Sequence, residues 1–97
     1  MVRYVVLLNF TESGATTAKT STERAAAFRA AAGKAGAEVE SVYWTLGSYD
    51  GVFVLRAPDE ATAASLVLDL AGKHTVRTCM LRAFDASEFK AIAAKLS

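Results

Sequence analysis

The sequence predicts an α+β fold in which two helices cover one face of a four-stranded antiparallel sheet and a third helix follows the last strand. Three observations lead to this fold class. Strand and helix patterns alternate over the 97 residues in the order β-α-β-β-α-β-α. Capping residues stand where the helices begin and glycines where the first two end. The first and third strands are also more apolar than the second and fourth.

The first strand and the first helix have clear patterns. Tyr4–Phe10 is β-branched and aromatic with apolar residues on both alternating faces, which indicates a central strand. A polar loop follows. Thr20 and Glu23 then have the spacing of a capping box, and a helix extends from there to Gly36, which is a suitable stop.

The second and third strands are expected to form a hairpin. Residues 38–47 are of mixed polarity, whereas residues 51–58 are densely apolar and end at Pro58. Gly47 and the Asp50-Gly51 pair between them are turn signals, because glycine tolerates the positive backbone dihedrals of a tight connection.

The second half of the chain contains two more helices around a fourth strand. Asp59 caps a helix that ends at Gly72, and residues 75–84 form a strand of mixed polarity. Asp85 caps the last helix, with Glu88 three residues later. The apolar residues of that helix fall along one face: Phe89, Ile92, Ala93 and Leu96.

The order of elements and the polarity of the strands agree with each other. The order β-α-β-β-α-β is that of the ferredoxin-like fold, in which the first and third strands are central and the second and fourth are edges. The chain length suits one such domain over residues 1–97.

The second face of the sheet has no helix to cover it, yet it is apolar. Val5 and Leu7 on the first strand and Val52 and Val54 on the third would otherwise meet water. A second copy of the same sheet is the simplest cover, so the sequence predicts a homodimeric α/β barrel joined through the open face, with a larger oligomer also open. The alternative is that the terminal helix folds across this face and the protein stays monomeric.

Alternation assigns two rows of side chains to the two faces. The more apolar row is expected to face the helices: Trp44, Leu46, Phe53, Leu55, Cys79 and Leu81. The more polar row is expected on the open face: Tyr43, Thr45, Val52, Val54, Arg56, Thr78, Met80 and Arg82. A slip of one residue would invert part of this assignment.

Composition and charge exclude several function classes. Eleven Lys and Arg residues balance ten Asp and Glu, and the basic residues are scattered, which argues against nucleic acid and anionic membranes as partners. A single cysteine, Cys79, rules out an internal disulfide, and no metal-binding motif is present. The first ten residues lack the features of a signal peptide, so a cytoplasmic protein is expected. A bound cofactor is not expected.

The hairpin sequence resembles the GYD-domain family. The most specific matches are Tyr43-Trp44-Thr45, the Gly47-x-Tyr49-Asp50 segment, Ala57-Pro58-Asp59 and Val76-Arg77-Thr78. The resemblance covers nearly the whole chain and implies a dimeric α+β barrel without an established reaction. By fold analogy alone it extends to cofactor-free monooxygenases and to stress-responsive barrel proteins. His74 lies outside the family's pattern.

Most residues of the hairpin have a structural explanation. Asp50 is interpreted as a turn residue in preference to a catalytic acid, and Trp44 as a core residue in preference to a ligand-stacking one. Tyr43 lies on the mixed row and is open to either role. Tyr49 packs its ring on the sheet edge with its hydroxyl in water, or contacts a ligand.

The arginines offer a sharper hypothesis. Arg56 and Arg82 either extend their guanidinium groups into water at strand ends or bind a carboxylate or phenolate ligand. Arg77 is expected to pair with Glu38 or Glu40. Among the weaker catalytic candidates, Asn9 could donate a hydrogen bond, His74 is the only histidine, and Asp50 is the third.

Three functions are compatible with these residues. The first is a homodimeric barrel that binds a small molecule, with Tyr43, Tyr49, Arg56 and Arg82 as ligand-binding residues. The second is a cofactor-independent oxygenase or isomerase acting on a small aromatic or quinone-type substrate, in which the arginines stabilise an enolate or phenolate. The third is a non-enzymatic oligomeric assembly module. An enclosed cavity would favour the first two over the third.

Overall fold

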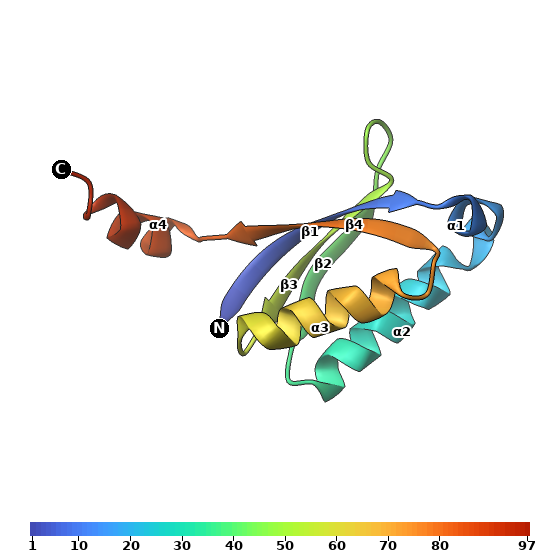
Figure 1. The fold of residues 1–97 in the computed structure, drawn as a ribbon, viewed down its shortest axis with the longest axis horizontal. Coiled ribbons are helices and arrows are strands. Elements are labelled where there is room, and N and C mark those ends of the chain that lie inside the picture. The colour runs from blue at the N-terminus through green and yellow to red at the C-terminus, as the bar shows by residue number, and fades with distance from the viewer.

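The computed structural model describes residues 1–97 as a sheet covered on one face by two helices (Figure 1). The elements in chain order are β1 (Val2–Phe10), α1 (Glu12–Thr16), the 3₁₀ turn η1 (Ala18–Thr20), α2 (Ser21–Lys34), β2 (Glu38–Trp44), β3 (Gly51–Ala57), α3 (Glu60–Ala71), β4 (Val76–Ala83) and α4 (Ala86–Ala93). No helix is long and apolar enough to cross a bilayer.

The sheet has the strand order β2-β3-β1-β4, and every neighbouring pair is antiparallel. This order confirms the ferredoxin-like fold with β1 and β3 in the centre. Helices α2 and α3 lie side by side on one face (Figure 1). The strands that the sequence marks as most apolar are therefore those with neighbours on both edges.

The core lies between the sheet and the two helices. Val6 and Leu55 are fully buried on the central strands, and Ala63 and Val67 of α3 pack against them. Phe28 of α2 meets Phe53 of β3 with ring centroids 4.9 Å apart in a tilted arrangement. Burial of each of the larger side chains contributes roughly 1.5–3 kcal/mol to stability, which holds the two helices on this face.

Most helix boundaries follow the expected signals. The Asp59 carboxylate accepts the Thr62 N–H at 2.7 Å, and Asp85 and Glu88 form a full capping box. Gly36 ends α2 with a φ of 79°. The capping box predicted at Thr20 is wrong: the Thr20 hydroxyl donates instead to the Thr17 carbonyl, because the preceding segment folds into α1 and η1.

The register of β4 corrects part of the face assignment. Tyr4 faces Arg82 and Val6 faces Met80 across the β1–β4 ladder, and directly opposed residues share a face. Thr78, Met80 and Arg82 therefore lie on the helix side, and Cys79 and Leu81 lie on the open face. Cys79 is exposed rather than buried. Leu46 is fully exposed in the hairpin loop and belongs to neither row.

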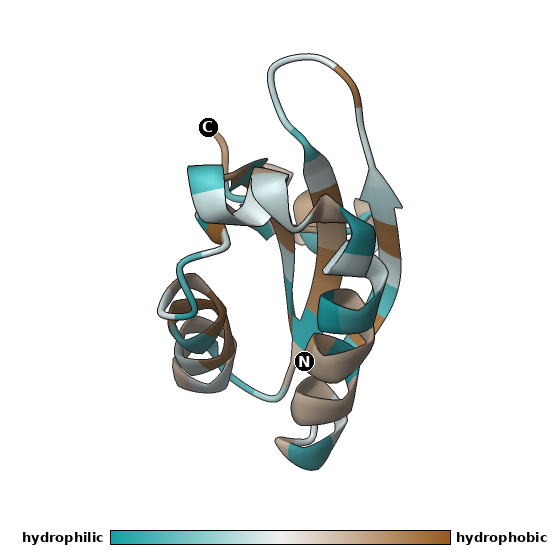
Figure 2. Cartoon of the chain, turned by 90° about the vertical axis from the view of Figure 1, so that its right-hand side faces the viewer, coloured by the Kyte–Doolittle hydropathy of each residue, from teal (hydrophilic) through white to brown (hydrophobic).

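Helix α4 does not lie across the open face of its own sheet. It continues outward from the end of β4, beyond the edge of the body (Figure 1). The molecule is correspondingly elongated, with extents of 50 × 31 × 19 Å. The β2–β3 loop also stands clear of the body at the opposite end of the sheet (Figures 1 and 2).

Candidate functional site

An apolar cleft of about 470 Å³ opens between α2 and the sheet. Leu8 and Phe10 of β1, Val42 of β2 and Phe53 of β3 contribute to its lining on the sheet side. The cleft has the size and the mainly apolar character of small-molecule sites in proteins. It is the largest hollow in the molecule and defines the candidate site.

The composition of α2 explains why this space is left open. The helix lines the cleft with Ala25, Ala26 and Ala30, and its larger apolar residue, Phe28, is buried in the core. An alanine side chain is a single methyl group, so it cannot fill the distance between a helix and the sheet below it. The alanines that favour the helix therefore also create the cleft.

Trp44 forms part of the cleft wall near its mouth. Its indole Nε1–H donates to the Ser21 hydroxyl at 2.9 Å, which joins the end of β2 to the start of α2. Trp44 is 46% exposed, so its interpretation as a core residue is wrong. It is the last residue of β2, which is an edge strand of the sheet.

Asp50 lines the cleft but holds the hairpin in place. Its carboxylate accepts the Phe10 N–H at 2.8 Å, and its own N–H donates to the Leu8 carbonyl at 2.8 Å. Its carbonyl accepts the Thr45 N–H at 2.9 Å. These bonds tie the β2–β3 connection to the end of β1, which agrees with the turn-forming role that the sequence favours.

Two arginines of α2 also line the cleft, and the sequence did not single them out. Arg24 donates to the Thr17 carbonyl at 3.0 Å and to the Thr20 hydroxyl at 2.8 Å. Arg29 donates to the Val39 carbonyl at 2.7 Å. Their helical spacing from Phe28 and Ala25 is the one signal that could have placed them beside the cleft.

The four residues predicted to bind a ligand do not converge on one cavity. Tyr43 touches the cleft, but 65% of it is exposed on the side of the sheet away from the helices. Tyr49 borders a separate hollow of about 280 Å³ beside the hairpin loop. Arg56 lies on the open face, and Arg82 lies on the helix side at the far end of the sheet. Neither arginine lines the cleft.

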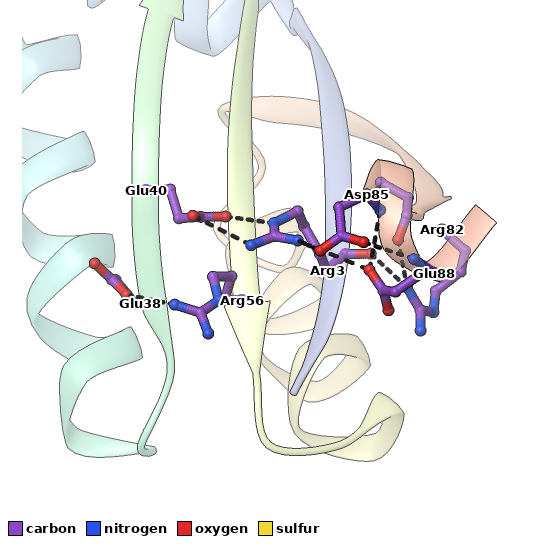
Figure 3. Close-up of polar contacts among 8 residues, drawn as sticks. Arg3, Glu38, Glu40, Arg56, Arg82, Asp85 and Glu88 are labelled. Atoms are coloured by element: carbon purple, nitrogen blue, oxygen red, sulfur yellow. Dashed lines mark hydrogen bonds and ion pairs between the residues drawn. The ribbon is translucent and has the colours of Figure 1, made fainter. Parts of the chain in front are cut away.

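Both of these arginines have partners within the chain. Arg56 pairs with Glu38 at 3.4 Å (Figure 3). Arg82 donates to the Arg3 and Ala83 carbonyls, and its guanidinium lies 4.5 Å from the centre of the Phe84 ring. These contacts explain their positions without a bound anion.

Asn9 and His74 lie apart from each other and outside the cleft lining. Asn9 faces Arg77 across the β1–β4 ladder. His74 is exposed in the loop before β4 with a φ of 64°, and its carbonyl accepts the Thr11 hydroxyl at 2.6 Å. Because β2 and β4 are opposite edges of the sheet, the predicted pairing of Arg77 with Glu38 or Glu40 is wrong.

A cluster of charges links three elements at one end of the open face (Figure 3). Arg3 donates to Glu40 at 2.6 Å, and its guanidinium lies 3.9 Å from the carboxylates of Asp85 and Glu88. The hydrogen bond from Arg3 lowers the pKa of Glu40, and the same bond raises the pKa of Arg3. The cluster holds the start of α4 close to the start of β1.

Comparison with known proteins places the chain in a family. The model of the GYD domain matches residues 4–93, which is nearly the whole sequence.

The chain belongs to the GYD-domain family.

Relatives of this GYD-domain protein agree with the assignment. The glutamine synthetase and cystathionine beta-lyase binding protein of Thermus thermophilus is 34% identical over 89 residues, covering 91% of this chain and 94% of that protein. A crystal structure of a Thermus thermophilus protein superimposes with a TM-score of 0.55 at 26% identity, covering 89% of this chain and 96% of the other. Both matches therefore extend over most of each chain.

Proposed function

We propose that this GYD-domain protein is a homodimeric barrel that binds a small molecule in the cleft between α2 and the sheet. The observation that carries the proposal is the cleft itself, with its apolar walls and its volume of about 470 Å³. The dimer supplies the missing cover for the other face of the sheet.

The open face has the anatomy of a protein interface. Its centre is apolar, with Val5 and Leu7 of β1 beside Val52 and Val54 of β3. Its charged pairs, Arg3–Glu40 and Arg56–Glu38, gather toward one end. An apolar centre with charges at the margin is the usual arrangement where two proteins associate.

The surface area of the chain also supports association. The accessible surface is 6253 Å², whereas a compact monomer of 10.3 kDa is expected to expose about 5,400 Å². The excess of about 850 Å² is close to the ~800 Å² that each partner buries in an interface of standard size. The radius of gyration points the same way, at 14.5 Å against about 12.5 Å for a compact chain of this length.

Binding is better supported than catalysis. A cofactor-independent oxygenase or isomerase needs an acid or base that can reach its substrate. Asp50, the one carboxylate in the cleft lining, accepts a backbone N–H, and His74 lies outside the lining. Arg56 and Arg82, the arginines that the sequence assigns to an enolate, lie outside the cleft, which leaves the cleft with groups for recognition.

A lysine placed in the open face tests the dimer. We expect the wild-type protein to sediment as a dimer at micromolar concentration and Val54→Lys to sediment as a folded monomer, because the interface would bury an unpaired charge. Leu68→Lys on α3 is the matched control, since Leu68 is 71% exposed on the helix layer and should leave the dimer intact. A wild-type monomer, or a dimeric Val54→Lys variant, would contradict the proposal.

A second candidate function is the binding of metabolic enzymes, and the name of the Thermus thermophilus relative favours it. The hairpin loop is a suitable contact because it stands clear of the body and its Leu46 side chain is fully exposed. Purified glutamine synthetase and cystathionine beta-lyase, each passed over the immobilised protein, provide the test. We expect binding that Leu46→Ser weakens and Leu68→Ser does not. No binding of either enzyme would remove this candidate.

A further inference from the structure

We propose that the cleft binds a carboxylate with a ring-sized apolar body, and that Arg29 of α2 holds the carboxylate group. This inference rests on the proposed small-molecule function and adds the chemical class of the ligand. It follows from the charges of the lining, which contains two arginines, Arg24 and Arg29, and a single carboxylate, that of Asp50. The lining is therefore positive and attracts an anion.

Arg29 keeps free the edge of its guanidinium group that a carboxylate recognises. Its Nη1 atom donates to the Val39 carbonyl at 2.7 Å, and the side chain makes no other hydrogen bond in the chain. None of the close charge contacts of the molecule involves Arg29. The Nε and Nη2 donors remain free, and together they can hold both oxygens of a carboxylate. The bond to Val39 already holds the guanidinium beside the cleft, so a ligand would not have to order it.

Arg24 adds positive charge to the lining, but its donors are less available. Its Nη1 atom donates to the Thr17 carbonyl at 3.0 Å and to the Thr20 hydroxyl at 2.8 Å, and its Nη2 atom lies 3.5 Å from the Gly14 carbonyl. A carboxylate bound by these nitrogens would disturb contacts that hold the start of α2. Arg24 therefore contributes attraction, and Arg29 is the anchor.

The carboxylate of Asp50 lies at the other end of the cleft from this anchor. The Asp50 carbonyl accepts the Thr45 N–H just after β2 ends, whereas Arg29 is bonded to Val39 at the start of β2. Most of the length of this strand separates the two points, which is roughly 15–20 Å. That separation exceeds the Debye length of about 8 Å at physiological ionic strength, so Asp50 repels an anion at Arg29 only weakly.

The apolar walls of the cleft receive the body of the ligand. Leu8, Val42 and Phe53 present apolar surface from the sheet, and the Trp44 indole adds an aromatic face. Aromatic rings stack on such faces or meet them edge-on. Arg29 is an exposed residue, so it lies at the margin of the cleft. A carboxylate bound there keeps part of its hydration while the apolar body enters, which avoids the cost of burying an unpaired charge.

A pair of probes that differ in charge but hardly in shape tests the ligand class. The pair is 2-naphthoate, which is an anion, and 2-naphthamide, which is neutral. Affinities are measured by isothermal titration calorimetry. We expect the protein to bind naphthoate about fivefold more tightly than naphthamide, which is the factor that an ion pair accessible to water can supply. The preference should shrink as the salt concentration rises.

Two variants of α2 test the anchor. Arg29→Gln removes the charge and should weaken naphthoate about fivefold while leaving naphthamide unchanged. The amide thus controls for any structural effect of losing the bond to Val39. Lys34→Gln removes a positive charge from the same helix at an exposed position outside the lining, and it should leave both affinities unchanged.

Trp44 reports where the probes bind. It is the only tryptophan in the chain, so its indole N–H gives a single resonance in a ¹H–¹⁵N spectrum, and both probes should shift it. Ala25→Leu fills the cleft and should weaken both probes about tenfold by steric overlap. Ala27→Leu makes the same change at an exposed position outside the lining and should leave both affinities unchanged.

The possible outcomes separate the two levels of the proposal. Naphthamide that binds as tightly as naphthoate and shifts Trp44 would overturn the ligand class while the small-molecule site stands. Naphthoate binding that Arg29→Gln leaves unchanged, or that Lys34→Gln weakens equally, would overturn the anchor. If neither probe bound, or if Ala25→Leu affected neither, the ligand class and the small-molecule function would both be overturned. Circular dichroism confirms that the variants fold.

Discussion

Gly14 shows how closely α1 packs against the start of β4. It is buried, and a Cβ atom added to it would lie 1.9 Å from the Thr75 carbonyl oxygen. The neighbouring Thr11 N–H donates to the same oxygen at 3.0 Å, so the backbone there cannot retreat easily. Only glycine permits this approach. Gly33 of α2 differs, because nothing lies within 4 Å of its added Cβ.

The same substitution at these two glycines is expected to have opposite effects. Gly14→Ala should destabilise the protein, because its methyl group overlaps a fixed backbone oxygen. Gly33→Ala should stabilise it by about 0.5–1 kcal/mol, because alanine restricts the unfolded chain and favours a helix. Urea unfolding of the two variants beside the wild type measures both changes. A loss of stability in Gly33→Ala, or none in Gly14→Ala, would contradict the packing described.

The Arg3–Glu40 pair predicts a pH dependence of stability. Since the hydrogen bond from Arg3 lowers the pKa of Glu40 in the folded state, the unfolded state binds more protons in the acid range. The stabilisation is present above the unfolded pKa of about 4.3 and is lost as the pH falls through the folded pKa. The raised pKa of Arg3 adds no change in the neutral range, because arginine remains charged there.

Glu40→Gln isolates this effect. The variant should have a lower urea midpoint than the wild type at pH 7, and the two midpoints should converge as the pH falls below 4. Glu23→Gln is the control, since Glu23 is exposed and belongs to none of the four close charge contacts. A difference that persists unchanged at low pH would show that Glu40 stabilises the fold by means other than its charge.

The candidate site could be predicted from the sequence only in part. The place of Asp50 before a glycine predicts a turn residue, and its bonds to β1 agree. The cleft was not predictable, because it arises from what alanines leave unfilled, and no residue pattern marks an empty volume. Arg24 and Arg29 were missed for a related reason: their partners are backbone carbonyls and hydroxyls, which carry no sequence signature.

At the scale of elements, α4 is the helix that packs least against the rest of its own chain. It has eight residues, and Phe89 and Ile92 are 59% and 40% exposed. Its capping box and the Arg3 contacts fix where it begins. Isolated helices shorter than about 12–15 residues are only marginally stable in water. In the proposed dimer, the apolar side of α4 can pack against the partner subunit.

Hydrogen exchange measures directly whether the partner subunit stabilises α4. Amides of residues 86–93 should be protected in the wild-type dimer and should exchange rapidly in the monomeric Val54→Lys variant. The double variant Phe89→Ser and Ile92→Ser should lose the same protection without affecting β1 or β3. Ala91→Ser, on the opposite side of the helix, is the control. Equal protection of α4 in the wild-type protein and the Val54→Lys variant would show that the helix is stable without a partner.

The position of a strand in the sheet was predictable where both faces of that strand have the same polarity. β1 and β3 are mostly apolar on both faces, so their central positions followed from burial alone. β4 carries polar and apolar residues on both rows, so alternation could not fix its faces, and the register with β1 decided them. The short helix α1 was missed because it lies in a polar segment, where Thr11 accepts the Gly14 N–H and begins it.

At the scale of the whole molecule, association should appear as a dependence of thermal stability on protein concentration. A ligand that binds only the folded state raises its stability by mass action, and a second copy of the chain acts in the same way. The melting temperature of the wild-type protein should therefore rise between micromolar and hundred-micromolar concentration. That of Val54→Lys should stay constant, and a wild-type value that is also constant would count against the dimer.

The strand order has a consequence for how the chain is made. β1 leaves the ribosome first, yet it pairs on one side with β3 and on the other with β4, so that Arg3 faces Arg56 and Ala83. One edge of this central strand must therefore wait, unpaired, until β4 has been synthesised. An unpaired apolar strand readily joins strands of other chains. Nascent chains of this protein should therefore stay prone to aggregate until β4 emerges, and factors that shield apolar segments at the ribosome should matter up to that stage.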